Sequence, residues 1–107
     1  MTKLHRHKLV SIITLDVLEE RLCKTFRKHG VSGYTIVRAR GEGASGECAG
    51  TLDFEANILV KVIIPNEKLE LLMESLERLI DKGYHLTIYV SDIEVIRPEK
   101  FSKPMEV

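Results

Sequence analysis

The chain has 107 residues, with 16 Lys and Arg, 16 Asp and Glu, four His and two Cys, and 44% of its residues are hydrophobic. This length predicts one domain with a hydrophobic core, which excludes a disordered protein, and the balanced charge argues against general nucleic-acid binding. No stretch approaches the roughly 20 apolar residues that span a bilayer, and residues 1–8 lack the apolar run of a secretory signal, so we expect a cytoplasmic protein.

The first part of the chain predicts a strand followed by a helix. Residues 8–15 form an almost continuous apolar run, which is typical of a strand covered on both faces. Asp16 and Glu19 have the spacing of a capping box, which predicts that a helix begins there. The apolar face of this helix repeats every four residues, at Leu18, Leu22 and Phe26. Gly30 predicts its end, and residues 1–7 are expected to form a flexible head.

Two strands separated by a long loop follow. Residues 34–40 carry β-branched and aromatic side chains and predict a strand whose end is basic at Arg38 and Arg40. Between residues 41 and 53 no periodicity persists, and four of the seven glycines of the chain fall there. We expect a long mobile loop in this segment. Residues 54–64 alternate with a period of two, which predicts a long third strand.

The last part of the chain predicts a second helix and a fourth strand. Asn66 is expected to cap a helix whose apolar stripe ends before Gly83. Residues 85–97 return to a strand pattern, with a bulge expected near Ser91. The tail, residues 99–107, is expected to be short, polar and mobile.

The order β, α, β, β, α, β is typical of a ferredoxin-like α+β fold, in which two helices cover one face of an antiparallel four-stranded sheet. Three of the predicted strands are apolar on both faces. In the strand over 54–64, for example, Leu59 and Ile63 lie opposite the row that contains Val60 and Val62. The second face of the sheet therefore exposes apolar area, and such a surface indicates a partner. We expect a homo-oligomer whose subunits pack through their sheets.

The loop of residues 41–53 is the main functional clue. It begins directly after a strand with two glycines in the run Gly41, Glu42, Gly43 and Ala44. Backbone amides there can line a concave anion site, to which Arg38 or Arg40 would add positive charge. On these residues alone, a hairpin loop without a ligand is the alternative interpretation.

The histidines and cysteines leave alternatives open. His5 and His7 would bind a metal if a strand held them, or would belong to a solvated head. His85 either contacts a ligand or occupies a surface turn. Cys23 and Cys48 have no close pairing and no CxxC spacing, so we expect free thiols in a reducing compartment, and their redox role stays open.

The sequence contains no nucleophile-elbow, metalloprotease or phosphate-loop motif. The acidic side chains of the second helix have the spacing of a solvated face: Glu67, Glu70, Glu74 and Glu77. The remaining carboxylate pair, Glu42 and Glu47, lies in the predicted mobile loop, which is a poor place for the fixed geometry of acid and base catalysis. We therefore expect no enzymatic activity, no cofactor and no bound metal.

Several segments, in this order, resemble the PII signalling superfamily: Gly33-Tyr34-Thr35, Gly41-Glu42-Gly43, residues 53–58, and the strand from residue 88 to Pro98. The resemblance covers nearly the whole chain. It is closest to the PII-like branch associated with inorganic carbon, which contains the cyanobacterial bicarbonate-transporter regulator and carboxysome-associated PII-like proteins. Members of this family are homotrimers of ferredoxin-like subunits that bind adenine nucleotides between neighbouring subunits, and their long T-loop engages or releases a target.

The resemblance implies that the chain binds AMP, ADP or ATP, with bicarbonate as a further ligand, and that residues 41–53 are the T-loop. Thr35 and the backbone around Asn57 and Ile58 would face the adenine. The ribose and phosphates would follow the backbone amides of Gly41, Glu42, Gly43 and Ala44. The turn before the fourth strand would close the cleft through Gly83, Tyr84, His85 and Leu86.

The resemblance further implies that counter-charge for the phosphates comes from Arg38, Arg40 and Arg97. The implied target is a protein such as a membrane transporter or a protein of carbon or nitrogen metabolism. The chain departs from the nitrogen-regulating PII proteins in the shorter turn before its fourth strand and in a T-loop that contains no Tyr for uridylylation. It also lacks the cysteine-bracketed tail of the bicarbonate-transporter regulator.

Three other classes of protein are alternatives. A metal-responsive trimer of the copper-tolerance type would bind its ion through His5, His7 or Cys48. An acylphosphatase-like enzyme would need a phosphate-binding loop after the first strand. Residues 15–17 contain no glycine there, and the carboxylate of Asp16 would repel the anion. An RNA-recognition module would need exposed aromatic side chains on its strands for base stacking, which the first and third predicted strands lack.

Overall fold

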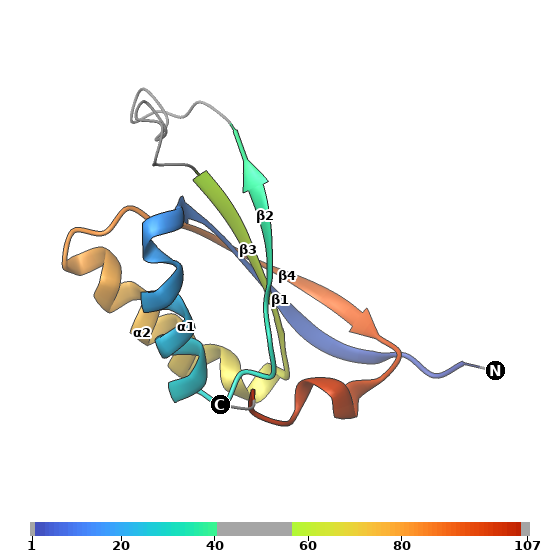
Figure 1. Cartoon of the computed structure of the whole chain (residues 1–107). Coiled ribbons are helices and arrows are strands. Elements are labelled where there is room, and N and C mark those ends of the chain that lie inside the picture. The colour runs from blue at the N-terminus through green and yellow to red at the C-terminus, as the bar shows by residue number, and fades with distance from the viewer. Residues whose placement is uncertain (1, 41–56, 106–107) are drawn as a thin grey trace.

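The computed structural model describes residues 2–40 and 57–105. Its helices and strands follow the predicted order (Figure 1): β1 (His5–Leu15), α1 (Glu19–Lys28), β2 (Thr35–Ala39), β3 (Asn57–Ile64), α2 (Leu69–Asp81) and β4 (Thr87–Val95). Short 3₁₀ turns precede both α-helices and follow β4, at Asp16–Leu18, Asn66–Lys68 and Pro98–Phe101. No helix in the described part of the chain has the length and apolar character needed to cross a membrane.

The four strands form one sheet in the order β2-β3-β1-β4, and every neighbouring pair is antiparallel. Both α-helices lie on the same side of this sheet (Figure 1). The predicted ferredoxin-like fold is therefore confirmed. The register is continuous across the centre of the sheet, where Val10 of β1 pairs with Val62 on one side and Val90 on the other.

The core lies between the sheet and the helices. It collects the alternate residues of β1 and β3 that point toward the helices, together with one stripe of each helix: Val10, Ile12, Ile58, Val60, Val62, Ile64, Leu22, Phe26, Leu72, Leu76 and Leu79. Every second residue of the strands and every third or fourth residue of the helices is apolar on one side, and these apolar sides face each other in the core.

Glycines end both α-helices, as the sequence predicts. Gly30 and Gly83 adopt positive φ angles of 66° and 104°, which side chains rarely tolerate. After α1, the amide of Gly30 donates to the carbonyl of Arg27, and that of Val31 to Phe26, at 3.1 and 3.0 Å. The amides of Gly83 and Tyr84 make the equivalent bonds after α2. These paired bonds form a Schellman motif at each end and satisfy carbonyls that the helix leaves free.

The predicted helix starts were wrong in detail. The chain enters each helix through a 3₁₀ turn, so Asp16 and Asn66 lie inside the first turn instead of at a cap, and neither helix start has a side-chain capping bond. The residues that precede these turns, Leu15 and Pro65, are extended and cannot cap through their side chains. One carboxylate oxygen of Asp16 is consequently buried without a hydrogen bond among the described residues.

The N-terminal segment is more ordered than predicted. β1 begins at His5, and its pairing with β4 runs without interruption from His5 opposite Val95 to Ile13 opposite Thr87. The expected bulge near Ser91 is therefore absent from the described strand. The predicted flexible head loses its last three residues to β1, because the antiparallel ladder with β4 satisfies their backbone groups.

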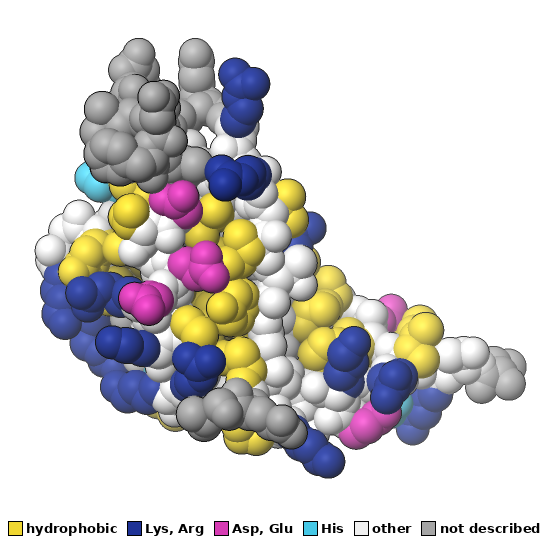
Figure 2. Space-filling view, in the orientation of Figure 1, with side chains coloured by type: hydrophobic (Ala, Val, Ile, Leu, Met, Phe, Trp, Pro, Cys, Tyr) yellow, Lys and Arg dark blue, Asp and Glu magenta, His cyan; other side chains and the backbone are white. Residues whose placement is uncertain are grey.

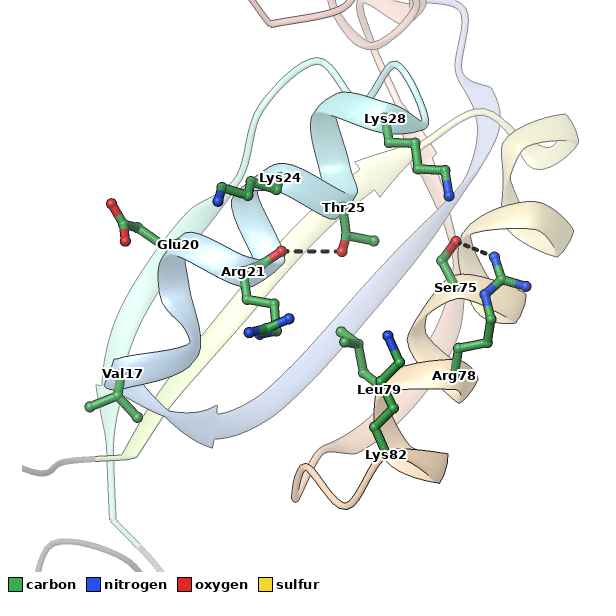
Figure 3. Close-up of a pocket in the computed structure, with 10 residues that line it drawn as sticks. All are labelled: Val17, Glu20, Arg21, Lys24, Thr25, Lys28, Ser75, Arg78, Leu79 and Lys82. Carbon is green, nitrogen blue, oxygen red and sulfur yellow. Dashed lines mark hydrogen bonds between the residues drawn. The ribbon is translucent and has the colours of Figure 1, made fainter.

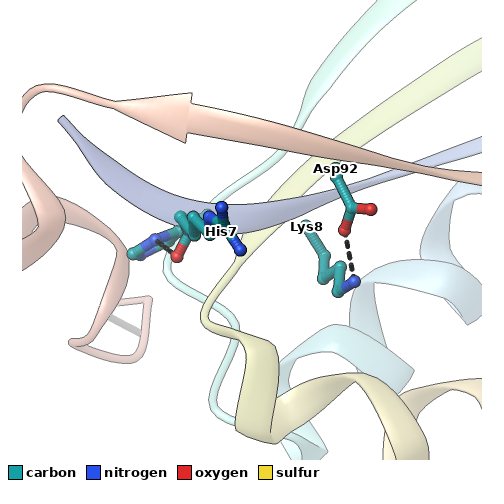
Figure 4. Close-up of polar contacts among 4 residues, drawn as sticks. His7, Lys8 and Asp92 are labelled. Carbon is teal, nitrogen blue, oxygen red and sulfur yellow. Dashed lines mark hydrogen bonds and ion pairs between the residues drawn. The ribbon is translucent and has the colours of Figure 1, made fainter.

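Side chains fix this end of the sheet as well. His7 is buried, and its ring packs edge-on against Phe101 with 5.7 Å between ring centroids. Lys8 forms an ion pair with Asp92 across the β1–β4 ladder (Figure 4), and this hydrogen-bonded ammonium lowers the pKa of the Asp92 carboxyl.

The tail also departs from the prediction of a mobile polar segment. Residues 98–101 form a 3₁₀ turn, and the backbone amide of Met105 donates to the carbonyl of Val31 at 3.0 Å. Met105 packs against the core. The apolar side chains of Phe101 and Met105 provide the burial that holds the segment against the sheet and the end of α1.

Candidate functional site

Three strand ends meet at one end of the sheet, which is called the edge from here on. Asn57, the first residue of β3, pairs with Leu15 at the end of β1 and with Ala39 at the end of β2. Antiparallel pairing brings these ends together, because β3 runs opposite to both of its neighbours. Asn57 is therefore the centre of this edge, and Arg40 extends just past it from β2.

The turn before β4 reaches the same edge. The hydroxyl of Thr14 in β1 donates to the backbone carbonyl of His85 at 2.8 Å, and Thr14 pairs with Ile58 of β3. This bond ties the turn to the sheet. Sequence analysis did not identify Thr14, because a single Thr in an apolar strand gives no signal of the carbonyl it will meet.

The side chains of that turn have different environments. Tyr84 and Leu86 are half-buried and pack against the core, whereas Gly83 and His85 are exposed. The guanidinium carbon of Arg21 in α1 lies 4.8 Å from the centroid of the Tyr84 ring, a cation–π contact that fixes the ring on its outer side. His85 is thus the side chain of the turn that is free to meet a ligand at this edge.

The predicted residues of β2 and β3 are divided between the two faces of the sheet. Arg38 pairs with Ile58 and is exposed at the edge strand, on the helix side. The Ile58 side chain is only 3% exposed and belongs to the core, so a ligand can meet only the backbone there. Thr35 pairs with Lys61, and both side chains lie exposed on the opposite, open face.

Arg97 lies far from the other predicted site residues. It follows the end of β4 that pairs with His5, while Thr87 at the start of β4 lies next to the turn. The strand in between has nine residues, which corresponds to about 27 Å. Arg97 instead faces Glu99, with 3.4 Å between Nε and a carboxylate oxygen. Within one chain, the structure does not bring Arg97 to the edge.

The edge as described is basic. Arg38 and Arg40 are both exposed, and no described carboxylate forms an ion pair with either of them. Exposed guanidinium groups that have no protein partner can take a planar anion such as phosphate or a carboxylate in a bidentate manner. The other predicted ligands of the phosphates, Gly41, Glu42, Gly43 and Ala44, lie outside the described residues.

The histidines of the alternative metal site share one face of β1. His7 Nδ1 lies 2.6 Å from the carbonyl oxygen of Arg6, and its Nε2 is buried (Figure 4). Neither nitrogen is therefore open to an ion from solvent. In the part of the chain that the structure describes, no group of three His, Cys, Asp or Glu side chains could hold a metal. Cys48 lies outside that part.

Comparison with known proteins identifies the family of this chain. The family model of nitrogen regulatory protein P-II matches residues 7–100. The chain belongs to the PII family. The fold agrees with this assignment: CPII, a PII-like protein of Thiomonas intermedia K12 in a structure with ADP, AMP and bicarbonate, superimposes with a TM-score of 0.84 at 32% identity, over 94% of this chain and 98% of CPII.

Other solved structures extend the likeness. A Thermus thermophilus protein described as PII-like and signalling gives a TM-score of 0.74 at 32% identity, over 92% of this PII-family chain and 98% of its own. The apo form of CPII gives 0.72 at 25% identity, over 89% and 97%. No curated protein matches the chain. The family resemblance and the ferredoxin-like fold predicted from the sequence are thus confirmed.

Proposed function

We propose that this PII-family chain is a non-enzymatic, cytoplasmic signalling protein that binds AMP, ADP or ATP, together with bicarbonate, in clefts between the subunits of a homotrimer. Ligand binding would change the conformation of the T-loop, residues 41–53, and so regulate a target. The target would belong to inorganic carbon or nitrogen metabolism, for example a membrane transporter or a carboxysome-associated protein. The single observation that carries this proposal is the basic edge where β2, β3 and the His85 turn meet.

The chemistry of that edge suits a nucleotide. Arg38 and Arg40 supply two cations for phosphate oxygens, and the end of β2 leads directly into the glycine-containing run. His85 offers an exposed imidazole on the other side of the edge, and Tyr84 is packed beneath it against the core. CPII, which shares this fold at 32% identity, was solved with ADP, AMP and bicarbonate. These features support adenine nucleotides and bicarbonate as ligands here.

The open face of the sheet supports a homotrimer. Val37 and Tyr89 on this face are 47% and 48% exposed, and half-buried apolar residues lie between them: Leu9, Ile13, Leu59 and Ile63. An apolar surface at the centre of a sheet is stabilised when another copy covers it. A neighbouring subunit would also provide a route for Arg97, which lies far from the edge of its own chain, to reach a cleft.

Isothermal titration with AMP, ADP and ATP, each with and without bicarbonate, tests this proposal on protein whose mass in solution has been measured by light scattering. We expect about one nucleotide per subunit of a trimer and an affinity that changes with bicarbonate. A monomeric mass, or no heat with any nucleotide, would contradict it.

A pair of variants locates the site. Arg38→Gln should weaken nucleotide binding by roughly tenfold, since a charge-assisted bond to phosphate is lost. Arg27→Gln removes an exposed guanidinium from α1, away from the edge, and should leave the affinity within about twofold. Equal losses in the two variants would place the phosphates elsewhere.

A further inference from the structure

A groove runs between α1 and α2 on the outer side of the helix layer. It encloses about 390 Å³ and is lined by one stripe of each helix. One stripe follows α1 at positions 21, 24 and 28 and begins at position 17 in the 3₁₀ turn before it; the other follows α2 at positions 75 and 78 and ends at position 82, just after the helix. Both have helical spacing along one face. The ten lining residues are drawn in Figure 3.

The groove is strongly basic although the whole chain has no net charge. Its lining contains five cationic side chains and one carboxylate, Glu20; the cations are Arg21, Lys24, Lys28, Arg78 and Lys82. Figure 3 shows Arg21, Lys28 and Lys82 reaching into the space between the helices, while Glu20 points away from it. Figure 2 shows Lys and Arg side chains gathered over the helix layer, with Asp and Glu side chains next to them. None of the five cations forms an ion pair with a described carboxylate.

The floor of the groove is polar and fixed. The Ser75 hydroxyl is buried, accepts a hydrogen bond from Arg78 at 2.9 Å, and lies 2.6 Å from Nε2 of His29. Burial, together with the nearby charges of Lys28 and Arg78, lowers the pKa of His29. The two neighbouring cations thus add to the effect of burial on this pKa.

Exposed apolar side chains flank the cations. Val17, in the 3₁₀ turn before α1, lines the groove, and Leu71 lies one turn before Ser75 in α2, just outside the lining; each is 61% exposed. The helices are antiparallel, since Arg21 near the start of α1 contacts Tyr84 after α2, while His29 after α1 contacts Ser75. Val17 and Leu71 therefore lie at opposite ends of a surface about 16 Å long.

From this arrangement we propose that the α1–α2 groove is a docking surface for an acidic, amphipathic segment of a partner protein. Carboxylates of the segment would pair with the cations, and apolar residues at its two ends would cover Val17 and Leu71. The shape favours a long partner segment over a compact anion. The cations are spread along the groove and remain exposed to solvent, where single ion pairs are weak. The helices lie opposite the open face of the sheet, so packing through that face leaves the groove accessible.

The proposal can be tested with the full chain and a fluorescent helical peptide that carries Glu at every third or fourth position and Leu at both ends of this stripe. Binding is followed by anisotropy at low and moderate salt. The variant Lys28→Gln/Lys82→Gln removes one exposed cation from each helix, and Lys3→Gln/Lys103→Gln removes two exposed cations outside the groove. We expect the first pair to weaken binding by roughly tenfold and the second by less than about twofold.

Further arms separate the other occupants. A peptide with Gln in place of Glu, or with Ser in place of Leu, should each bind more weakly, which would support both parts of the contact. Equal losses in the two double variants would overturn the proposal, because the attraction would then be nonspecific. Full displacement of the peptide by tripolyphosphate, added at the same concentration of negative charge, would assign the groove to compact anions. Self-association abolished by Lys28→Gln/Lys82→Gln would assign it to a second copy.

Discussion

The two faces of the sheet carry similar alternating patterns but have different fates. The helix-facing residues of β1 and β3, such as Val10 and Val62, are fully buried by α1 and α2. On the open face, Leu59 and Ile63 remain half-buried, and no described element of the chain covers the centre of that face. Apolar burial within the chain therefore stabilises the fold, whereas the same chemistry on the other face is available for association.

The largest expected effect lies on the covered face. Phe26 is 1% exposed and packs between α1 and the sheet, so Phe26→Ala should lower the free energy of unfolding by about 3–5 kcal/mol. Urea denaturation followed by circular dichroism measures the change. A loss below about 1 kcal/mol would mean that this face does not carry the stability assigned to it.

Substitutions on the open face should act on assembly instead. Val37→Lys introduces a charge into the apolar surface of the sheet, so we expect the mass measured by light scattering to fall toward that of a monomer. Ile80→Lys, at a residue of α2 that is 42% exposed, is the matched control and should leave the mass unchanged. The reverse result would move the subunit contact to the helices.

The bond between the sheet and the turn before β4 should have an intermediate effect. Thr14→Val keeps the shape of the side chain but removes the hydroxyl that donates to the His85 carbonyl, so stability should fall by about 1–2 kcal/mol. Hydrogen exchange should accelerate at residues 84–86 more than in α1. Uniform acceleration across the chain would show that the bond has no local role.

The smallest effect concerns pH. The pKa of His29 is lowered in the folded chain, mainly by burial and further by Lys28 and Arg78, so the unfolded chain binds the proton more readily. Stability should therefore decrease slightly as pH falls below the ordinary His pKa of about 6.5. Comparing urea midpoints of the wild type and His29→Gln across this range isolates the contribution. A wild-type dependence that His29→Gln leaves intact would assign the effect to another group.

The sequence by itself determined the element order, the apolar stripe of each helix and the C-terminal ends of both helices. Alternation in β3 and the three-to-four spacing in α2 are local patterns, and Gly30 and Gly83 end their helices through backbone conformations that depend on the residue itself. The family resemblance was also present in the sequence, because its motifs are contiguous runs.

Only the tertiary structure decided which distant groups meet. The pairing of residues 5–7 with β4, with His7 packed against Phe101, and the attachment of Met105 to Val31 gave regular contacts to parts of the predicted flexible head and tail. Tertiary packing likewise placed Thr14 on the His85 carbonyl, separated Arg97 from the edge, and combined two helical stripes into one basic groove. These contacts join residues far apart in the chain, and local periodicity contains no information about which strand, turn or helix face a side chain will meet.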